Sequence, residues 1–128
     1  MSNDNDIEQR LFKVISEALQ KPIEAISGNK KLFIDFNIES VEALELEFAI
    51  EEEFNVKIDE KSLWKIPSYL TNQGMVENGD YNNEARTMIQ KAFPLVMEDT
   101  IKNIKTANDI YKEITVQDIV YFLEENSK

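Results

Sequence analysis

Residues 35–58, DFNIESVEALELEFAIEEEFNVKI, decide the fold and most of the function that the sequence predicts. They predict a helix that begins at Ser40 and ends near Phe54, and seven glutamates occur from Glu39 onward. A serine at a helix start lies beside unpaired backbone N–H groups and the positive end of the macrodipole, which favours a phosphate there. The acids that follow would repel nucleic acid and attract basic protein surfaces. Together these features indicate a carrier that holds a phosphate-linked group at Ser40 and passes it between basic partners.

At about 100° per residue, this helix presents two apolar stripes rather than one. The first stripe contains Ala43, Leu46, Ile50 and Phe54, and the second, roughly opposite, contains Val41, Leu44 and Phe48. The acids Glu42, Glu45, Glu52 and Glu53 form one border between the stripes, and Glu47 and Glu51 form the other. Packing against the protein core accounts for one of the two stripes. The second must face another helix, a bound ligand or a partner protein.

The absence of cysteine and histidine removes several classes of chemistry. The chain has no thiol nucleophile, no imidazole base and no soft metal ligand, so we expect neither an enzyme nor a metal site. A small enzyme that uses paired carboxylates is the weakest alternative, because nothing suggests a substrate pocket with divergent pKa values. The net charge of −11 argues against nucleic acid binding. Residues 39–60 hold nine acids and one base, for which a solvated charged face is the plainer interpretation.

Hydrophobic periodicity elsewhere predicts an all-α fold without strands. We expect helices over residues 6–20, 60–70 (broken near Pro67), 83–93 and 96–105, and a last helix capped by Thr115. The long loop at 21–39 should lie over the core, held by its apolar residues Ile23, Ile26, Leu32, Phe33, Ile34 and Phe36. No segment is long and apolar enough to insert into a membrane, and the acidic N-terminus is unlike a leader. A cytoplasmic monomer is therefore expected.

The same residues resemble a known family, the bacterial acyl carrier proteins. The family pattern D-L-G-x-D-S-L, followed by E-L-x-x-x-x-E-E-x-F, is similar to residues 35–54, and I-x-T-V-x-D is similar to residues 112–118. The similarity covers about residues 5–60 and 110–125. It implies a four-helix bundle whose serine carries 4′-phosphopantetheine through a phosphodiester. It also implies thioester-bound acyl intermediates in fatty-acid, lipid or polyketide-type biosynthesis.

By position, the resemblance assigns roles to residues of this chain. Ser40 takes the prosthetic group, and Glu39, directly before it, is the second residue expected at the cofactor-binding site. The expected partners are a phosphopantetheinyl transferase and acyl-loading, synthase or acyltransferase enzymes with basic patches. The residues expected to bind these partners are Val41, Glu42, Leu44, Glu45, Phe48, Glu51 and Glu52. Those expected to line a core or acyl pocket are Leu46, Ile50 and Phe54.

The chain departs from the family pattern in three places. Glu39 replaces the aspartate before the serine, and Asn37 replaces a glycine, although asparagine tolerates a positive φ. The alternative hypothesis is therefore a carrier-like fold that is never loaded and serves as an acidic protein-interaction module.

The third departure is a helical insertion at residues 61–109 within a single carrier domain of residues 1–128. Its many apolar residues should form a folded cap that enlarges an acyl cavity, contacts a dedicated enzyme or only stabilises the bundle. These residues are Leu63, Trp64, Ile66, Leu70, Met88, Ile89, Phe93, Leu95 and Ile101.

Overall fold

Helices make up most of the chain, and they belong to two compact units. The computed structural model describes residues 3–126, with the side chains of residues 6–126. One unit, here called the bundle unit, combines the chain up to Ile58 with the chain from Thr115 onward. The other, here called the insertion unit, is Asp59–Ile114. The prediction of an all-α, carrier-like fold with a helical insertion is confirmed.

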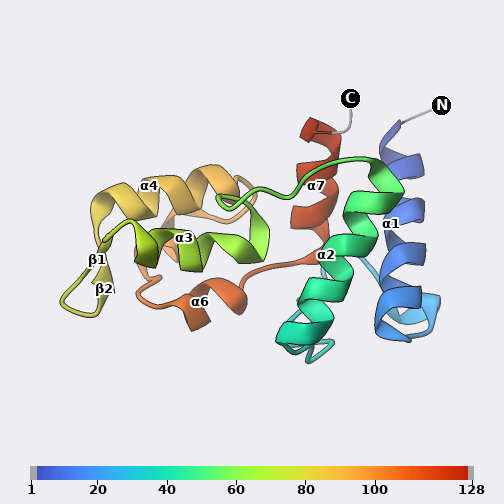
Figure 1. Cartoon of the computed structure of the whole chain (residues 1–128), viewed down its shortest axis with the longest axis horizontal. Helices are drawn as coiled ribbons and strands as arrows, with labels where there is room; N and C mark the ends of the chain where they lie inside the picture. The colour runs from blue at the N-terminus through green and yellow to red at the C-terminus, as the bar shows by residue number, and fades with distance from the viewer. Residues whose placement is uncertain (1–2, 127–128) are drawn as a thin grey trace. The chain divides into compact units, whose positions relative to one another are not determined.

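The bundle unit is built on three long helices (Figure 1). They are α1 (Asn3–Leu19), α2 (Ser40–Phe54) and α7 (Val116–Asn126), and α1 packs against both of the others. A short 3-10 helix, η1 (Ile23–Ala25), follows α1. The buried apolar faces of the three helices supply the core, which contains Leu11, Val14, Ile15, Leu19, Leu46, Ile50, Ile119, Val120 and Leu123.

The loop before α2 lies over this core as predicted, but with fewer anchors. Ile26, Leu32 and Phe36 are buried, whereas the predicted anchors Ile23 and Ile34 are 44% and 52% exposed. Spacing in a loop does not fix which way a side chain points, so those two expectations were wrong.

Backbone hydrogen bonds join the same loop to the start of α7. The N–H groups of Gln117 and Val116 donate to the carbonyls of Gly28 (2.8 Å) and Lys30 (2.9 Å). Thr115 caps α7 as predicted: its N–H donates to Asp118 Oδ2 at 2.9 Å, and its Oγ1 accepts from the Asp118 N–H at 3.2 Å. The T-V-x-D pattern is therefore a capping box that also fixes the end of the loop.

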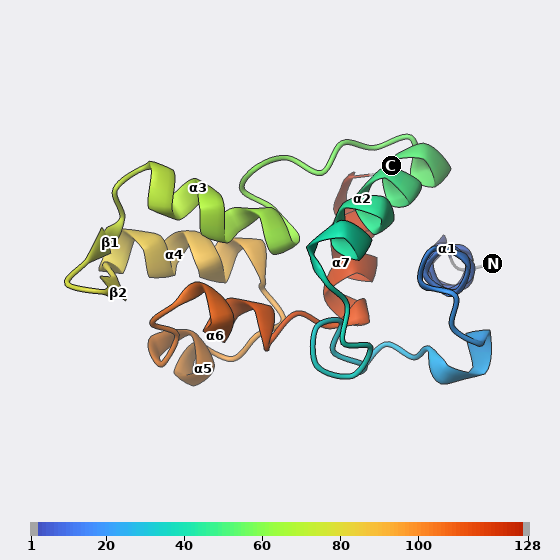
Figure 2. The same cartoon turned by 60° about the horizontal axis from the view of Figure 1, so that its bottom comes forward.

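The insertion unit contains four short α-helices, a 3-10 helix and a hairpin. In chain order its elements are η2 (Leu63–Lys65), α3 (Ile66–Asn72), β1 (Val76–Glu77), β2 (Asp80–Tyr81), α4 (Asn83–Ala92), α5 (Glu98–Lys102) and α6 (Ala107–Tyr111). Figure 2 shows α3 and α4 side by side, and residues of the two helices are in contact. Seven of the nine apolar residues predicted to fill this unit are buried; Met88 is half-buried and Leu95 is 48% exposed.

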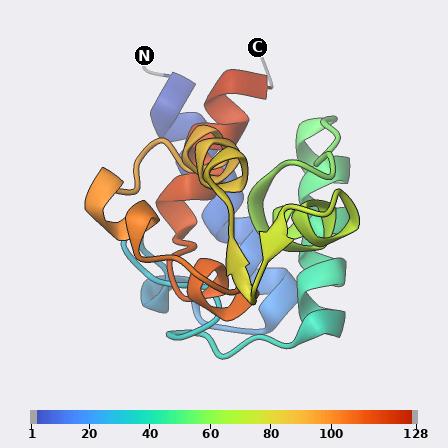
Figure 3. The same cartoon turned by 90° about the vertical axis from the view of Figure 1, so that its left-hand side faces the viewer.

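Three features of the insertion unit differ from the prediction. The antiparallel strands β1 and β2 were not expected (Figure 3). Two residues per strand give no period-two pattern, and the only signal was Asn78-Gly79, where both φ angles are positive. Pro67 lies in the first turn of α3, where its missing N–H costs nothing, so it starts that helix instead of breaking it. Helix α6 was also missed, although Thr106 and Asp109 form its capping box.

This capping box predicts a pH-dependent stability. The Asp109 carboxylate accepts from the N–H groups of Lys105 (2.9 Å) and Thr106 (3.2 Å), and these bonds lower its pKa. A lowered pKa stabilises the folded state above the unfolded pKa, and this stabilisation is lost as the pH falls through the folded pKa. Asp109→Asn should therefore lower the free energy of unfolding by about 0.5–1 kcal/mol near neutral pH.

Urea unfolding at several pH values measures this effect. The difference between Asp109→Asn and the wild type should shrink as the pH falls through the lowered folded-state pKa of Asp109, where the wild-type carboxyl becomes protonated. Asn108→Ala, at an exposed neighbour without a titrating group, is the control and should show a pH-independent difference. A constant difference for Asp109→Asn would contradict the assigned role of its charge.

Candidate functional site

Ser40 is the first residue of α2, and its side chain is exposed. Glu39 precedes it in an extended conformation, and its carbonyl accepts the N–H of Ala43 at 2.9 Å, the first bond of the helix. The Glu39 N–H donates to Glu42 Oε1 at 3.0 Å. The serine hydroxyl therefore lies in solvent at the positive end of a helix of 15 residues.

The turn before the serine uses a left-handed residue. Asn37 has a φ of 51°, so asparagine adopts here the conformation that glycine would adopt more easily. Ile38, between Asn37 and the cap, is buried and anchors the turn to the bundle unit. Asp35 fixes the other side, since its Oδ2 accepts the Lys31 N–H at 2.7 Å. Asn37 therefore adopts the positive φ that asparagine tolerates, as the sequence suggested.

The two apolar stripes of α2 have opposite environments, as the helical spacing requires. Leu46 and Ile50 are fully buried, and Ala43 and Phe54 are each 7% exposed. The second stripe lies in solvent, with exposed fractions of 67% for Val41, 49% for Leu44 and 58% for Phe48. Ser40 and this second stripe therefore form one continuous surface along α2.

Apart from Glu53, which pairs with Arg10 at 3.0 Å, the acids of α2 divide into three groups. Glu45 and Glu52 are exposed beside the apolar stripe and can meet a partner directly. Glu42 and Glu51 are half-buried and bind backbone: Glu42 caps the helix start, and Glu51 Oε2 accepts the Ile58 N–H at 2.8 Å. Glu47, which was expected on a solvent border, is only 8% exposed. Helical spacing alone does not distinguish these groups, because it does not say where the loop after α2 returns.

The charge of the chain is concentrated around this helix. The bundle unit holds 16 acids and 7 bases, a net −9, whereas the insertion unit has 9 acids and 7 bases, a net −2. Both units contribute to the total of −11. A basic partner is therefore attracted mainly to the bundle unit.

The buried residues predicted to receive an acyl chain lie in packed core. A surface hollow of about 460 Å³ occurs elsewhere, between α1 and α2, and is lined by Val14, Glu17, Ala18, Ala49, Glu52 and Glu53. At the C-terminal end of α2, the Arg10 guanidinium stacks on the Phe54 ring, 4.5 Å from its centroid. Arg10 also donates to Glu53 Oε2 (3.0 Å) and to the Glu53 carbonyl (2.7 Å). The sequence did not indicate this hollow, because small and acidic residues line it.

Two further findings concern the part of the chain that the structure describes. It contains no cluster of three or more acids that could hold a metal ion. Within residues 3–126, no helix has both the length and the apolar character needed to cross a membrane.

Reversing Glu45 and Glu52, the two exposed acids beside the second apolar stripe, should weaken partner binding. Glu45→Lys with Glu52→Lys should slow association with a basic phosphopantetheinyl transferase by roughly tenfold at low salt, because steering by charge is lost. The wild-type rate should also fall as salt rises, since charges are screened beyond about 8 Å at physiological ionic strength. Stopped-flow or surface plasmon resonance kinetics measure both the association rate of the variant and the salt dependence of the wild-type rate.

A matched control has the same net charge. Glu24→Lys with Glu125→Lys changes two exposed acids of the bundle unit outside α2 and should keep nearly the wild-type rate. Equal slowing by both pairs would show that only net charge matters, which would contradict a specific role for α2.

Comparison with known proteins identifies relatives of the chain. The family model described as "Phosphopantetheine attachment site" matches residues 9–70, which include the later part of α1 and all of α2 with Ser40. The acyl carrier protein of Buchnera aphidicola subsp. Schizaphis graminum is 34% identical over 62 residues, 48% of this chain and 78% of the relative. That of Rickettsia bellii (strain RML369-C) is 35% identical over 66 residues, 52% of this chain and 77% of the relative.

"Acyl carrier protein 3" of Ralstonia nicotianae is 36% identical over 62 residues, 48% of this chain and 70% of the relative. No solved structure matches the chain. The part that the family model matches contains the exposed serine, the turn and the acidic helix described above. The alignments with the relatives cover 78%, 77% and 70% of their lengths. The chain therefore belongs to the acyl carrier protein family, whose prosthetic group is a covalently attached 4′-phosphopantetheine.

Proposed function

We propose that this protein carries acyl groups on a 4′-phosphopantetheine arm attached to Ser40 through a phosphodiester. The observation that carries the proposal is the exposed hydroxyl of Ser40 at the first position of α2, at one end of an exposed apolar stripe. When bound, the arm supplies the thiol that the chain lacks and holds the acyl group as a thioester. The protein supplies the attachment point, the recognition surface and the shelter.

The residues around Ser40 fit such a group. A phosphodiester there would face the N-terminal N–H groups and the positive end of the macrodipole of α2. The left-handed turn at Asn37 and the buried Ile38 hold Ser40 outward, where a modifying enzyme can reach it. Glu39 is exposed directly before the serine and forms a capping box with Glu42, so a transferase that reaches Ser40 would contact Glu39 as well.

The exposed face of α2 is the proposed recognition surface. Val41, Leu44 and Phe48 supply apolar contact, while Glu45 and Glu52 pair with arginine or lysine of a transferase, synthase or acyltransferase. Glu42 and Glu51 contribute less directly to partner binding, since each carboxylate already accepts a hydrogen bond from a backbone N–H. The protein is proposed to act as a monomer, because its partners and a second copy would compete for this face.

The packed residues Leu46, Ile50 and Phe54 are the proposed shelter for an acyl chain. They are apolar and buried on the side of α2 opposite the recognition surface. An acyl chain would therefore have to displace existing contacts among them. The pathway proposed is fatty-acid, lipid or polyketide-type biosynthesis.

Acyl charging tests the carrier role. The protein, first loaded by a transferase with coenzyme A and Mg²⁺, should gain the mass of a fatty acyl group when an acyl-adenylating ligase, ATP and the fatty acid are added. Neutral hydroxylamine should remove that mass, because it cleaves thioesters. An acyl mass that resists hydroxylamine, or no acyl mass on loaded protein, would favour the acidic interaction module.

A further inference from the structure

The surface hollow of the bundle unit has one wall on α1 and the other on α2, two helices that lie side by side (Figure 1). The more buried part of its lining is apolar: Val14 is 8% exposed, and Ala18 and Ala49 are half-buried. Its volume of about 460 Å³ is within the range of about 300–1,000 Å³ that is typical of small-molecule sites. The hollow is therefore large enough for one long side chain or a small molecule.

The exposed part of the lining is acidic on both helices. It consists of Glu17 on α1, and Glu52 and Glu53 on α2. Glu53 already pairs with Arg10 at 3.0 Å. Among the described residues, Glu17 and Glu52 have no ion-pair partner. Two unpaired carboxylates, one from each helix, therefore flank the apolar part of the hollow.

Bases outside the lining leave the hollow acidic. Lys13 and Lys21 lie four residues before and after Glu17, but neither lysine lines the hollow or forms an ion pair with Glu17. Helix α2 contains no base. A cation is therefore the favoured occupant, because it would pair with carboxylates that now face water.

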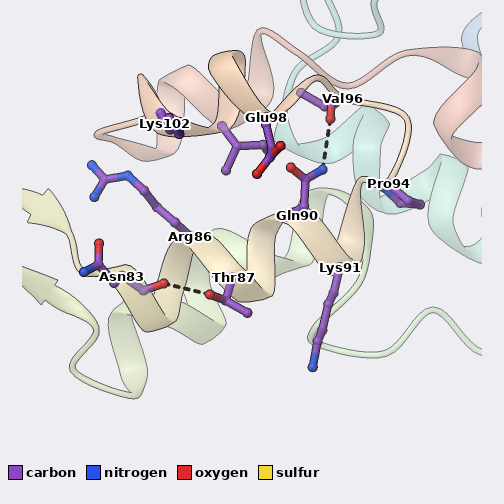
Figure 4. A pocket seen from close by; sticks show the side chains of 10 residues that line it. Asn83, Arg86, Thr87, Gln90, Lys91, Pro94, Val96, Glu98 and Lys102 are labelled. Atoms are coloured by element: carbon purple, nitrogen blue, oxygen red, sulfur yellow. Dashed lines mark hydrogen bonds between the residues drawn. The ribbon is translucent and has the colours of Figure 1, made fainter.

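A hollow in the insertion unit has a different charge distribution. It has a volume of about 800 Å³ and lies between α4 and the segment of residues 94–102 (Figure 4). Its charges are balanced, since Arg86 pairs with Asp80 at 2.7 Å, and Lys102 and Glu98 both line it. Unpaired charge of one sign is therefore a particular feature of the hollow between α1 and α2.

This hollow adjoins the proposed recognition surface of α2. Glu52 belongs to both. The exposed Phe48 lies one turn before Glu52 on the same side of the helix, and Ala49 of the hollow directly follows Phe48. A partner that covers Phe48 would therefore also come next to the hollow.

We propose that the hollow receives an arginine side chain of the enzyme that docks on α2. This proposal rests on the proposed function, in which the exposed face of α2 binds partner enzymes. The aliphatic part of the arginine would cover Val14, Ala18 and Ala49. Its guanidinium, a planar fork with five N–H donors, would bond to Glu17 and Glu52.

Arginine fits this hollow better than lysine does. The guanidinium is weakly hydrated and can bond to carboxylates from two helices at once, whereas the compact ammonium of lysine holds its water strongly. Glu17 is thereby a partner-binding residue outside α2. The hollow would favour enzymes that present an arginine beside their apolar contact with Phe48.

Amide-resolved NMR titration of the full-length protein with N-acetyl-arginine methylamide tests the chemistry of the occupant. The shifts should saturate with a Kd of roughly 10 mM, as expected for a single side chain, and should be largest for residues 14–18 and 49–53. The lysine analogue, which has the same charge, should bind more weakly, and the neutral alanine analogue should not saturate. No saturation with the arginine analogue up to about 100 mM, or lysine binding as strong as arginine binding, would overturn the proposal.

Two variants test the hollow itself, by the same titration and by calorimetric binding of a phosphopantetheinyl transferase. Glu17→Gln removes one charge-assisted contact and should weaken both kinds of binding roughly tenfold. Ala49→Leu fills the hollow without a change of charge and should also weaken both, while leucine preserves helix propensity. Glu24→Gln, at an exposed acid of the bundle unit outside the hollow, is the control and should bind like the wild type.

Val41→Asp separates this proposal from the proposed function, because Val41 is on the exposed stripe of α2 but does not line the hollow. It should weaken transferase binding and leave binding of the arginine analogue unchanged. If Val41→Asp weakens transferase binding but Glu17→Gln and Ala49→Leu do not, the role of the hollow is wrong and the recognition surface of α2 stands. If none of the three variants weakens transferase binding, both are wrong.

Discussion

Phe48→Asp is expected to weaken partner binding strongly while the protein stays folded, whereas Leu46→Asp, two residues earlier in the same helix, is expected to destabilise the bundle unit strongly. Phe48 is 58% exposed and Leu46 is fully buried, so the same charged side chain enters water at one position and the core at the other. A buried carboxylate without partners, together with the lost leucine packing, should cost about 4 kcal/mol or more. That is a large part of a typical stability of roughly 5–15 kcal/mol.

Phe48→Asp and Leu46→Asp are matched controls for each other, because each adds one negative charge to α2. Phe48→Asp should change the free energy of unfolding by about 0.5 kcal/mol or less and weaken transferase binding more than tenfold. Val41→Asp, on the same exposed stripe, should behave like Phe48→Asp. Urea unfolding followed by circular dichroism and calorimetric binding measure the two quantities. Transferase binding at wild-type strength by both Val41→Asp and Phe48→Asp would place the interface elsewhere.

The sequence predicted α2 in most of its detail because a helix of 15 residues gives a strong periodic signal. The spacing of Leu46 and Ile50 against that of Val41 and Phe48 predicted which side is buried, and the structure agrees. Short elements carry no such signal. The strands β1 and β2 have two residues each and α6 has five, so only Asn78-Gly79 and the Thr106–Asp109 capping box could have indicated them.

The site was predicted less completely than the helix that carries it. That Glu51 binds the Ile58 N–H depends on where the chain turns after Asn55, which is left-handed with a φ of 54°. A helical projection of α2 does not show that turn, so the spacing of the acids could not predict the contact between Glu51 and Ile58. Likewise, the sequence did not indicate the hollow between α4 and residues 94–102, which Arg86 and Gln90 help to line, because spacing within a segment does not say which other segment packs against it.

Ser40→Ala is expected to remove all capacity for the prosthetic group. The phosphodiester needs a hydroxyl, and among the described serines Ser40 alone begins a long helix beside the acidic face. The substitution should barely change stability, because the cap is Glu39 rather than Ser40 and the serine side chain is exposed. Ser68→Ala, at an exposed serine of α3, is the matched control and should load like the wild type.

The most direct measurement is the mass of the protein after incubation with coenzyme A, Mg²⁺ and a broad-specificity phosphopantetheinyl transferase, followed by fragmentation to locate the arm. The wild type and Ser68→Ala should each gain one 4′-phosphopantetheine, and the fragments should place it on Ser40. Ser40→Ala should gain none. A wild-type protein that stays unmodified with several transferases, including one from its own source, or an arm found on another residue, would contradict the assignment of Ser40 as the carrier site.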